Sequence, residues 1–303
     1  MYLIGIDIGG TNLKVGLIKD GEIINKIVQP TNSFDLIKQV VTTVKEILIQ
    51  NNMDLQEIEG VGVGCPGIIN NGVVVESANL KLFDCDLQKI LEQELGKPVI
   101  IKNDADMATL AEFKYGAGIG TKNMILLTVG TGIGGGSIIE GKLMEGNGGA
   151  GEFGHITYVK NGIPCNCGRR GCIEKYVSAI ALSNRAKEKK LTMENNIPIR
   201  EDNEVYASDL VKAYEMGDKC AKVIIDEYVE DLSNMVLSLC NIFRPEKIII
   251  GGGIAYAPKI ISMVADTCKN NFYGYKNSPK VDIVSAKLGN DAGIIGVSAC
   301  FPN

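Results

Sequence analysis

The sequence predicts an α/β fold in which two similar domains face each other across a cleft. Its length of 303 residues is typical of two domains. Segments with the spacing of strands alternate with segments that have the spacing of helices. A strand, a glycine turn, a second strand and an acidic-glycine turn occur at residues 6–21 and again at residues 127–141, which indicates a duplicated unit. Clefts between domains are common ligand-binding sites.

Composition and charge exclude several classes of function. The chain has 31 Lys and Arg residues, 36 Asp and Glu residues and a net charge of −5. This balance, without a basic stripe, predicts no nucleic-acid partner. No apolar run approaches the length of a membrane-spanning helix, and the first residues do not resemble a signal peptide. We therefore expect a cytoplasmic protein without a membrane partner. We also expect a homodimer, because dimers are the commonest oligomers.

The first half of the chain predicts alternating strands and helices. Three strands are expected within residues 2–28, joined by turns at residues 9–11 and 20–21. The apolar spacing of residues 33–50 predicts a helix, which one of the polar residues 31–33 can cap. The elements expected after it are a strand at 60–64, a hairpin at 68–75, a helix at 86–95, a strand at 98–101 and a helix at 104–115.

The second half repeats this order after a glycine-rich hinge at residues 116–122. The expected elements are strands at 124–129 and 135–139, a long helix at 218–243 and a strand at 246–250 that ends in glycines. Residues 289–301 have a helical pattern and are expected to return to the first domain. We therefore expect one domain over residues 1–117 and 289–303, and a second over residues 118–288.

Three glycine turns that follow predicted strands point to phosphate binding. They are Gly9-Gly10-Thr11, residues 130–136 with Thr131 and Gly132, and Gly251-Gly252-Gly253. Glycine lets backbone N–H groups approach phosphate oxygens closely. At the first turn, Asp7 can hold Mg²⁺ through water, Thr11 can offer its hydroxyl group, and Lys14 adds positive charge.

The better-known nucleotide motifs do not fit this chain. Residues 62–67 and 130–135 both match G-x-G-x-x-G, but a hairpin and a strand follow them, whereas a dinucleotide-binding motif opens a helix. A Walker A motif is absent from the sequence. Nucleotide binding would therefore use a hairpin-type phosphate loop.

Three clustered cysteines and the single histidine of the chain form a compact motif. The four candidate ligands are His155, Cys165, Cys167 and Cys172. A Cys₃His set is typical of a closed, structural zinc site. Glu152 and Glu174 flank the motif, so a zinc ion there can organise a ligand site around them. The other six cysteines are scattered and are expected to be free thiols in a reducing compartment.

Asn103 and Asp104 lie where a strand is expected to end and a helix to begin. Asp104 has two explanations: it caps the helix, or it accepts a proton from a substrate hydroxyl group. The second explanation fits its place at the carboxyl end of a strand, where α/β proteins bind ligands. Asn103 can both donate and accept a hydrogen bond. Asp106, in the first helical turn, is explained by the helix dipole alone.

Taken together, these motifs resemble the ROK family of sugar kinases (repressor, open reading frame, kinase), within the actin/hexokinase/heat-shock ATPase superfamily. The matching segments are residues 7–14, 62–67, 103–105, 128–136, 151–155, 165–174, 251–255 and 288–293. They span nearly the whole chain, and the zinc motif with its upstream histidine is the most specific of them. Cys65 occupies a position where other small residues also occur in the family.

The resemblance implies two RNase H-like domains that close over a cleft, with ATP and Mg²⁺ as cofactors and a structural zinc ion. Asp104 would be the general base that deprotonates a sugar hydroxyl group. The other residues implied to contact the sugar are Asn79, Asn103, Glu152, His155 and Glu174. Those implied to contact ATP and Mg²⁺ are Asp7, Gly9, Gly10, Thr11, Lys14, Thr131, Gly132, Gly251, Gly252 and Gly253. One ring nitrogen of His155 would bind zinc and the other would face the sugar.

The resemblance leaves the substrate open. Glucose, phosphorylated on C6, is the first choice, because an acidic–His set beside a full zinc motif is typical of bacterial glucokinases in this family. Fructose, N-acetylmannosamine and N-acetylglucosamine are the alternatives. A sugar-responsive transcriptional regulator of the same family would carry an N-terminal helix-turn-helix, whereas here a strand is expected from Tyr2. An ATPase that activates an iron–sulfur enzyme would lack both the zinc motif and the Asn103-Asp104 pair.

Overall fold

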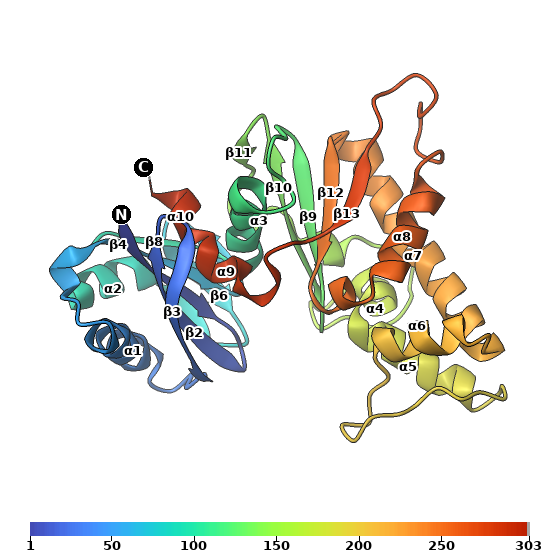
Figure 1. Cartoon of the computed structure of the whole chain (residues 1–303), viewed down its shortest axis with the longest axis horizontal. Helices are drawn as coiled ribbons and strands as arrows, with labels where there is room; N and C mark the ends of the chain where they lie inside the picture. Colours follow the sequence, from blue (N-terminus) through green and yellow to red (C-terminus); the bar gives the residue numbers. More distant parts are fainter. Residues whose placement is uncertain (302–303) are drawn as a thin grey trace.

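Two five-stranded sheets with the same strand order form the frame of the molecule (Figure 1). This computed structural model describes residues 1–301. The first sheet has the order β3 (Glu22–Pro30), β2 (Asn12–Lys19), β1 (Tyr2–Ile8), β4 (Ile58–Cys65) and β8 (Val99–Asn103). The second has the order β11 (Lys142–Leu143), β10 (Ile133–Ile139), β9 (Met124–Val129), β12 (Lys247–Gly251) and β13 (Asp282–Ser285). The duplication predicted from the sequence is confirmed.

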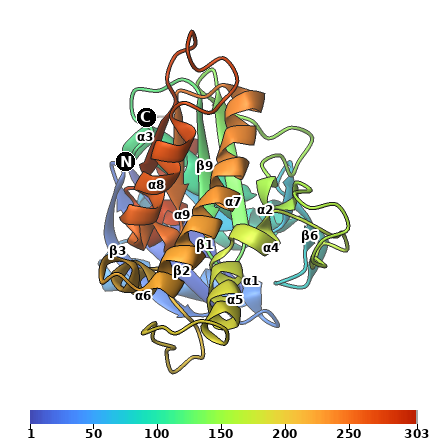
Figure 2. The same cartoon turned by 90° about the vertical axis from the view of Figure 1, so that its right-hand side faces the viewer.

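Helices cover the outer face of each sheet. Those on the first sheet are α1 (Leu36–Gln50) and α2 (Leu87–Leu95). Those beside the second sheet are α4 (Glu174–Val177), α5 (Ala179–Lys190), α6 (Ala207–Glu215), α7 (Lys219–Phe243) and α8 (Pro258–Cys268). Figure 2 shows α7 and α8 in front of the second sheet, and α4, α5 and α6 pack against α7. In β1, Ile4 and Ile6 belong to the core under α1 while Leu3 belongs to the core on the opposite face, as the two-residue period of a strand requires.

Helix α3 (Asp104–Tyr115) lies between the two sheets (Figure 1). Its Met107 packs into the core of the first sheet, and its Phe113 packs against the core of the second. Because α3 is covered by the first sheet on one side and by the second sheet on another, its apolar residues are not confined to one face of the helix. Two short helices near the C-terminus, α9 (Ala292–Ile295) and α10 (Val297–Cys300), pack beside α3 on the first sheet.

Smaller elements complete the fold. A three-stranded sheet beside β8 contains β5 (Ile68–Asn70), β6 (Val73–Ser77) and β7 (Leu82–Cys85). The 3₁₀ helices are Leu55–Glu57, Phe153–His155, Gly253–Tyr256 and Gly289–Asp291. The helical pattern expected at residues 289–301 is present in three short pieces, and residues 302–303 of the predicted first domain lie outside the described residues. Within residues 1–301, no helix is both long and apolar enough to cross a membrane.

One predicted helix start is wrong. The first helix begins at Leu36, three residues later than expected, and its preceding residue, Asp35, makes no side-chain cap. The Asn32 side chain instead accepts a hydrogen bond from the backbone N–H of Phe34 at 3.1 Å, which holds this segment in a turn. Phe34, which belonged to the apolar pattern, is therefore 90% exposed.

Candidate active site

A cleft of about 1500 Å³ lies between the two sheets and collects nearly all of the predicted site residues. From the first half of the chain it is lined by Asp7, Gly9, Gly10, Lys14, Asn79, Asn103 and Asp104. From the second half it is lined by Thr131, Gly132, Glu152, His155, Glu174, Gly251 and Gly252. Thr11 and Gly253 lie beside this lining rather than in it, and both are exposed. Residues far apart in the sequence thus share one cleft.

Asp104 lies where β8 meets α3, and the cap of α3 is the residue before it. The Asn103 carboxamide oxygen accepts hydrogen bonds from the N–H groups of Ala105, at 2.8 Å, and Asp106, at 3.4 Å. Its amide group donates to the Gly67 carbonyl at 2.9 Å. The explanation of Asp104 as the helix cap is therefore wrong. Asp104 keeps one contact of its own, to the N–H of Ala105 at 3.0 Å, and lines the cleft.

The surroundings of Asp104 make its carboxylate a stronger base than that of an exposed aspartate. Burial raises the pKa of this carboxyl group, and the nearby carboxylates of Asp7 and Glu152 raise it further, against the lowering effect of the Ala105 N–H. Burial also raises the pKa of Glu152, while His155 opposes that shift. A carboxylate with a raised pKa is a better proton acceptor near neutral pH. The ionised Asp104 carboxylate is therefore suited to accept a proton from a hydroxyl group bound in the cleft.

The first glycine turn joins β1 to β2 at one end of the cleft. Its backbone is tight, since the N–H of Gly9 donates to the Asn12 carbonyl at 2.8 Å. At its base, Lys14 Nζ lies 2.7 Å from Asp7 Oδ2 and 3.1 Å from the carbonyl oxygen of Asn290. The Asp7 carboxylate thus faces the cleft beside a positive charge, a donor set that suits a hydrated Mg²⁺ ion and phosphate oxygens.

The second glycine turn is held by a carboxylate, Glu174, that lies just after the zinc motif. Glu174 Oε2 accepts a hydrogen bond from the N–H of Ile133 at 2.9 Å. A Cβ atom on Gly132 would lie 2.5 Å from the same oxygen, so the glycine lets the Glu174 carboxylate approach the turn this closely. The carbonyl of Gly130 also accepts a hydrogen bond from Ala179 N at 2.8 Å, at the start of α5. The helices that follow the zinc motif therefore fix the shape of this turn.

The four predicted zinc ligands come together in space. Their ligand atoms all lie within 4.8 Å of one another. Cys167 Sγ lies 3.6 Å from Cys172 Sγ, and Cys165 Sγ lies 3.7 Å from His155 Nδ1. Zinc–sulfur bonds of about 2.3 Å in a tetrahedron place neighbouring ligand atoms about 3.5–3.8 Å apart. The set therefore fits a tetrahedral zinc ion.

Residues 155–172, the zinc loop, carry the four ligands and also reach the cleft, where His155 and Cys167 are part of the lining. His155 turns Nδ1 toward the thiols and Nε2 toward Glu152, whose Oε2 lies 3.9 Å away. The Tyr158 hydroxyl donates to Asp231 on α7 at 2.8 Å and anchors the loop. A zinc ion would thus hold the His155 ring with its second nitrogen at the cleft wall.

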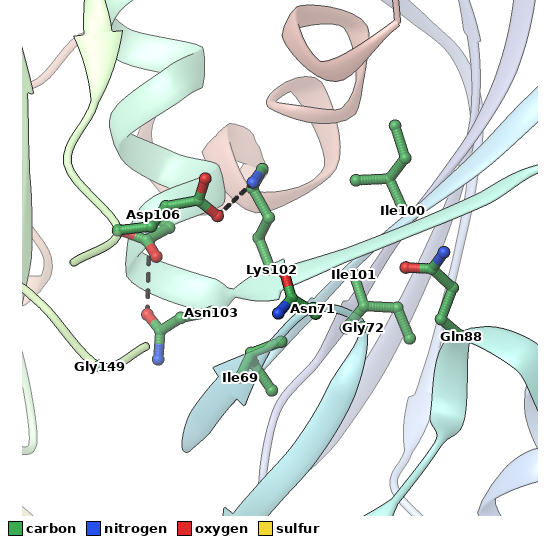
Figure 3. Close-up of a pocket in the computed structure, with 11 residues that line it drawn as sticks. Ile69, Asn71, Gly72, Gln88, Ile100, Ile101, Lys102, Asn103, Asp106 and Gly149 are labelled. Carbon is green, nitrogen blue, oxygen red and sulfur yellow. Dashed lines mark hydrogen bonds and ion pairs between the residues drawn. The ribbon is translucent and has the colours of Figure 1, made fainter. Parts of the chain in front are cut away.

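Asp106 is not explained by the helix dipole alone, contrary to the sequence-based interpretation. The residue is 9% exposed, and within residues 1–301 its Oδ1 atom has no hydrogen-bond partner. Burial raises the pKa of Asp106 to about 7. Asp106 and Asn103 line one end of a side cavity of about 380 Å³, with Gln88 and Ile100 at the other end (Figure 3). The sequence pattern shows its place in the first turn but not its burial.

Among the cleft residues that were not predicted are Lys26, Tyr256 and Asp291. Lys26 Nζ lies 2.5 Å from Asp291 Oδ1, an ion pair between β3 and the C-terminal segment. Tyr256 lines the cleft beside the third glycine turn and is 68% exposed. Tyr256 could have been predicted, because it is an aromatic residue just after the predicted phosphate turn Gly251–Gly253. The ion pair had no such signal, because its partners are distant in the sequence.

Comparison with known proteins gives one family and several relatives. The model of the ROK family matches residues 3–303. A glucokinase of Halalkalibacterium halodurans is 36% identical over 97% of this chain and 93% of its own length. An N-acetylmannosamine kinase of Haemophilus influenzae is 28% identical over 98% of this chain and 94% of its own. The crystal structure of a ROK family glucokinase from Streptomyces griseus in complex with glucose and AMPPNP has a TM-score of 0.83, with 29% identity and 99% of both chains covered.

Proposed function

The chain belongs to the ROK family of sugar kinases, and we propose that it transfers the γ-phosphoryl group of ATP to the C6 hydroxyl group of glucose. One observation carries the proposal: a buried carboxylate with a raised pKa, Asp104, lines the cleft near Asp7 and Glu152. The glucokinase from Halalkalibacterium halodurans and the S. griseus structure with glucose and AMPPNP support the choice of substrate and nucleotide.

The sugar is proposed to lie between Asp104 and the zinc loop. Asn103 and Asp104 would hold its reactive end, because both line the cleft at the junction of β8 and α3. Glu152, His155 and Glu174 would hold its other hydroxyl groups from the opposite wall, with Asn79 contributing from the loop after β6. Carboxylates and an imidazole nitrogen are suited to accept hydrogen bonds from hydroxyl groups.

The nucleotide is proposed to lie across the three glycine turns. Asp7, Gly9, Gly10, Thr11, Lys14, Thr131 and Gly132 would contact the phosphates and Mg²⁺, and Gly251–Gly253 would lie against the adenosine. Mg²⁺ supplies charge neutralisation for the transferred group when it is bound. The backbone N–H groups of the turns and the Lys14 ammonium group supply the remaining stabilisation of the phosphate charge.

In the proposed reaction, Asp104 accepts the proton of the C6 hydroxyl group as O6 attacks the γ-phosphorus atom. The new O6–P bond forms while the bond between the γ-phosphorus and the bridging oxygen of ADP breaks, and ADP leaves with that electron pair. Most of the acceleration comes from holding the two reactants in line. Closure of the cleft would exclude water, so that ATP is not hydrolysed instead.

Zinc is proposed to have a structural role in this mechanism. The four ligand atoms leave no protein ligand position open for a substrate. The ion would fix the zinc loop and therefore the direction of the His155 ring. The same loop leads directly into Glu174 and α4.

An assay of ADP release across a panel of hexoses tests the proposed function. Glucose is expected to have the highest kcat/KM, and ³¹P–¹H coupling in the product is expected to show the phosphate on C6. The N-acetylmannosamine kinase relative makes N-acetylmannosamine the main alternative substrate, and fructose and N-acetylglucosamine complete the panel. A clear preference for one of these sugars would replace glucose in the proposal, and no ADP release with any sugar would overturn it.

A further inference from the structure

Glu112 on α3 is a buried carboxylate that the proposed reaction does not use. Its residue is 1% exposed. Oε2 accepts a hydrogen bond from the N–H of Ala117 at 2.7 Å. Oε1 accepts two, from the N–H of Lys287 at 2.8 Å and from the N–H of Leu288 at 2.7 Å. Within residues 1–301 it forms no ion pair, so backbone amides alone satisfy its charge.

The three amides belong to the two places where the chain passes between the sheets. Ala117 follows α3 and begins the first crossing, which leads to β9. Lys287 and Leu288 follow β13 and begin the second crossing, which leads back to α9 on the first sheet. The described chain passes from one sheet to the other at these two segments only. A single carboxylate therefore binds both connections.

The local sequence is adapted to this carboxylate. A Cβ atom on Gly116 would clash with Glu112 Oε2, so the close approach of the carboxylate to this peptide needs glycine there. On the other side of the first crossing, Lys247 Nζ donates to the Ala117 carbonyl at 2.7 Å. The backbone N–H and C=O groups of Ala117 are therefore both held by side chains, the first by Glu112 on α3 and the second by Lys247 on β12.

The second crossing continues into the nucleotide side of the cleft. The carbonyl of Asn290 accepts a hydrogen bond from Lys14, and Asp291 pairs with Lys26. A Cβ atom on Gly293 would lie 3.0 Å from the Asp7 side chain, so this segment packs directly on Asp7. A displacement of residues 287–288 would therefore reach the residues proposed to hold Mg²⁺ and phosphate.

We propose that Glu112 is a positioning residue that joins the two crossings into one hinge, so that the domains close over sugar and ATP by rotation about this carboxylate. The proposal rests on the proposed function and on the predicted domain boundaries at residues 117/118 and 288/289. A carboxylate suits this role, because its oxygens accept hydrogen bonds over a broad range of directions. The three bonds can therefore persist while the backbone on either side turns.

Variants of Glu112 separate this role from a general effect on stability. Glu112→Gln keeps the size of the side chain but places an NH₂ donor against at least one of the three backbone donors, and Glu112→Ala removes all three hydrogen bonds. Glu46→Gln, on the exposed face of α1, is the matched control. The measurements are kcat, KM for glucose, the melting temperature, and the change in radius of gyration on adding glucose, from small-angle X-ray scattering.

We expect kcat to fall by about tenfold or more in Glu112→Ala and by less in Glu112→Gln, with KM for glucose changed by less than about threefold. The contraction caused by glucose is expected to be reduced in the same order, at a temperature where each variant is folded. The control is expected to match the unaltered protein. Glu112 variants that contract and turn over like the control would overturn the proposal.

Hydrogen exchange on the unaltered protein gives a second test, which does not depend on the stability of any variant. The amides of Ala117, Lys287 and Leu288 are expected to exchange slowly both with and without glucose, because their hydrogen bonds to Glu112 persist through closure. Rapid exchange of these amides in either state would contradict the role of Glu112 in the hinge. If no sugar produces contraction or turnover in the unaltered protein, the proposed function fails, and this result is distinct from a normal enzyme with unaffected Glu112 variants.

Discussion

Glu174 accepts a hydrogen bond from the backbone N–H of Ile133 at 2.9 Å, which joins the end of the zinc motif to the second glycine turn. Glu174 lies in the cleft wall proposed to bind the sugar, and Ile133 begins β10 directly after Thr131 and Gly132, which are proposed to contact the phosphates of ATP. One carboxylate therefore links the two halves of the proposed reaction. This link predicts that a change at Glu174 affects both substrates.

Glu174→Ala is expected to raise KM for ATP by about tenfold at saturating sugar, because the loss of a charged hydrogen-bond acceptor frees the glycine turn. KM for the sugar is expected to rise as well. Steady-state kinetics with each substrate varied in turn measures both effects. Glu188→Ala, at an exposed position on α5, serves as the control. An unchanged KM for ATP would show that the turn does not depend on Glu174.

Asp104→Asn tests the proposed general base. The amide cannot accept the proton of the sugar hydroxyl group, so kcat is expected to fall by about 10²–10⁴. Sugar affinity is expected to stay within about threefold, because an amide of the same shape keeps most hydrogen bonds to hydroxyl groups. Rapid-quench kinetics and calorimetric titration with glucose measure the two quantities. A rate close to that of the unaltered enzyme would remove Asp104 from its role.

Asp106 predicts a specific pH dependence of stability. Its pKa is raised from 3.8 to about 7 in the folded state, so the unfolded state loses this proton first as pH rises. The contribution of Asp106 to the free energy of unfolding therefore falls between about pH 4 and pH 7 and stays low above that range. Asp106→Asn removes this loss and is expected to be more stable at pH 8 by about 2–4 kcal/mol.

Urea unfolding at pH 5 and pH 8 measures the Asp106 effect. The advantage of Asp106→Asn over the unaltered protein is expected to be clearly smaller at pH 5. Asp35→Asn, at the exposed start of α1, is the control and is expected to be the same at both pH values. Equal advantages of Asp106→Asn at pH 5 and pH 8 would mean that Asp106 is ionised in the folded protein throughout.

Zinc content and its removal test the metal motif. Metal analysis is expected to find about one zinc ion per chain. Cys167→Ser, or treatment with a strong chelator, is expected to lower the melting temperature by several degrees and raise KM for the sugar by about tenfold, because the zinc loop would no longer hold His155 and Glu174. Cys85→Ser, on β7, is the control. A fully active, metal-free enzyme would disprove the assignment.

The elements that were predicted well have strong local patterns. Helix α7 begins after Asp218, whose side chain accepts from Ala221 N, and α2 ends at the left-handed Gly96, as their sequences indicate. The sequence interpretation missed β7, β11, β13, α4, α5, α6 and α8. The three strands have at most four residues each, and α5 carries many charged residues and a weak apolar stripe, so neither the two-residue period of a strand nor the 3.6-residue period of a helix stands out there.

The duplicated α/β unit, the glycine turns and the zinc motif could be predicted from the amino-acid sequence, because each depends on residues close together in the chain. The three-dimensional fold was needed to show that Asn103, rather than Asp104, caps α3, that Asp106 is buried, and that Glu112 holds both crossings. These properties depend on burial and on backbone amides that come from distant segments. Local spacing carries no information on either, since hydrogen bonding and desolvation are set by whatever the fold brings alongside.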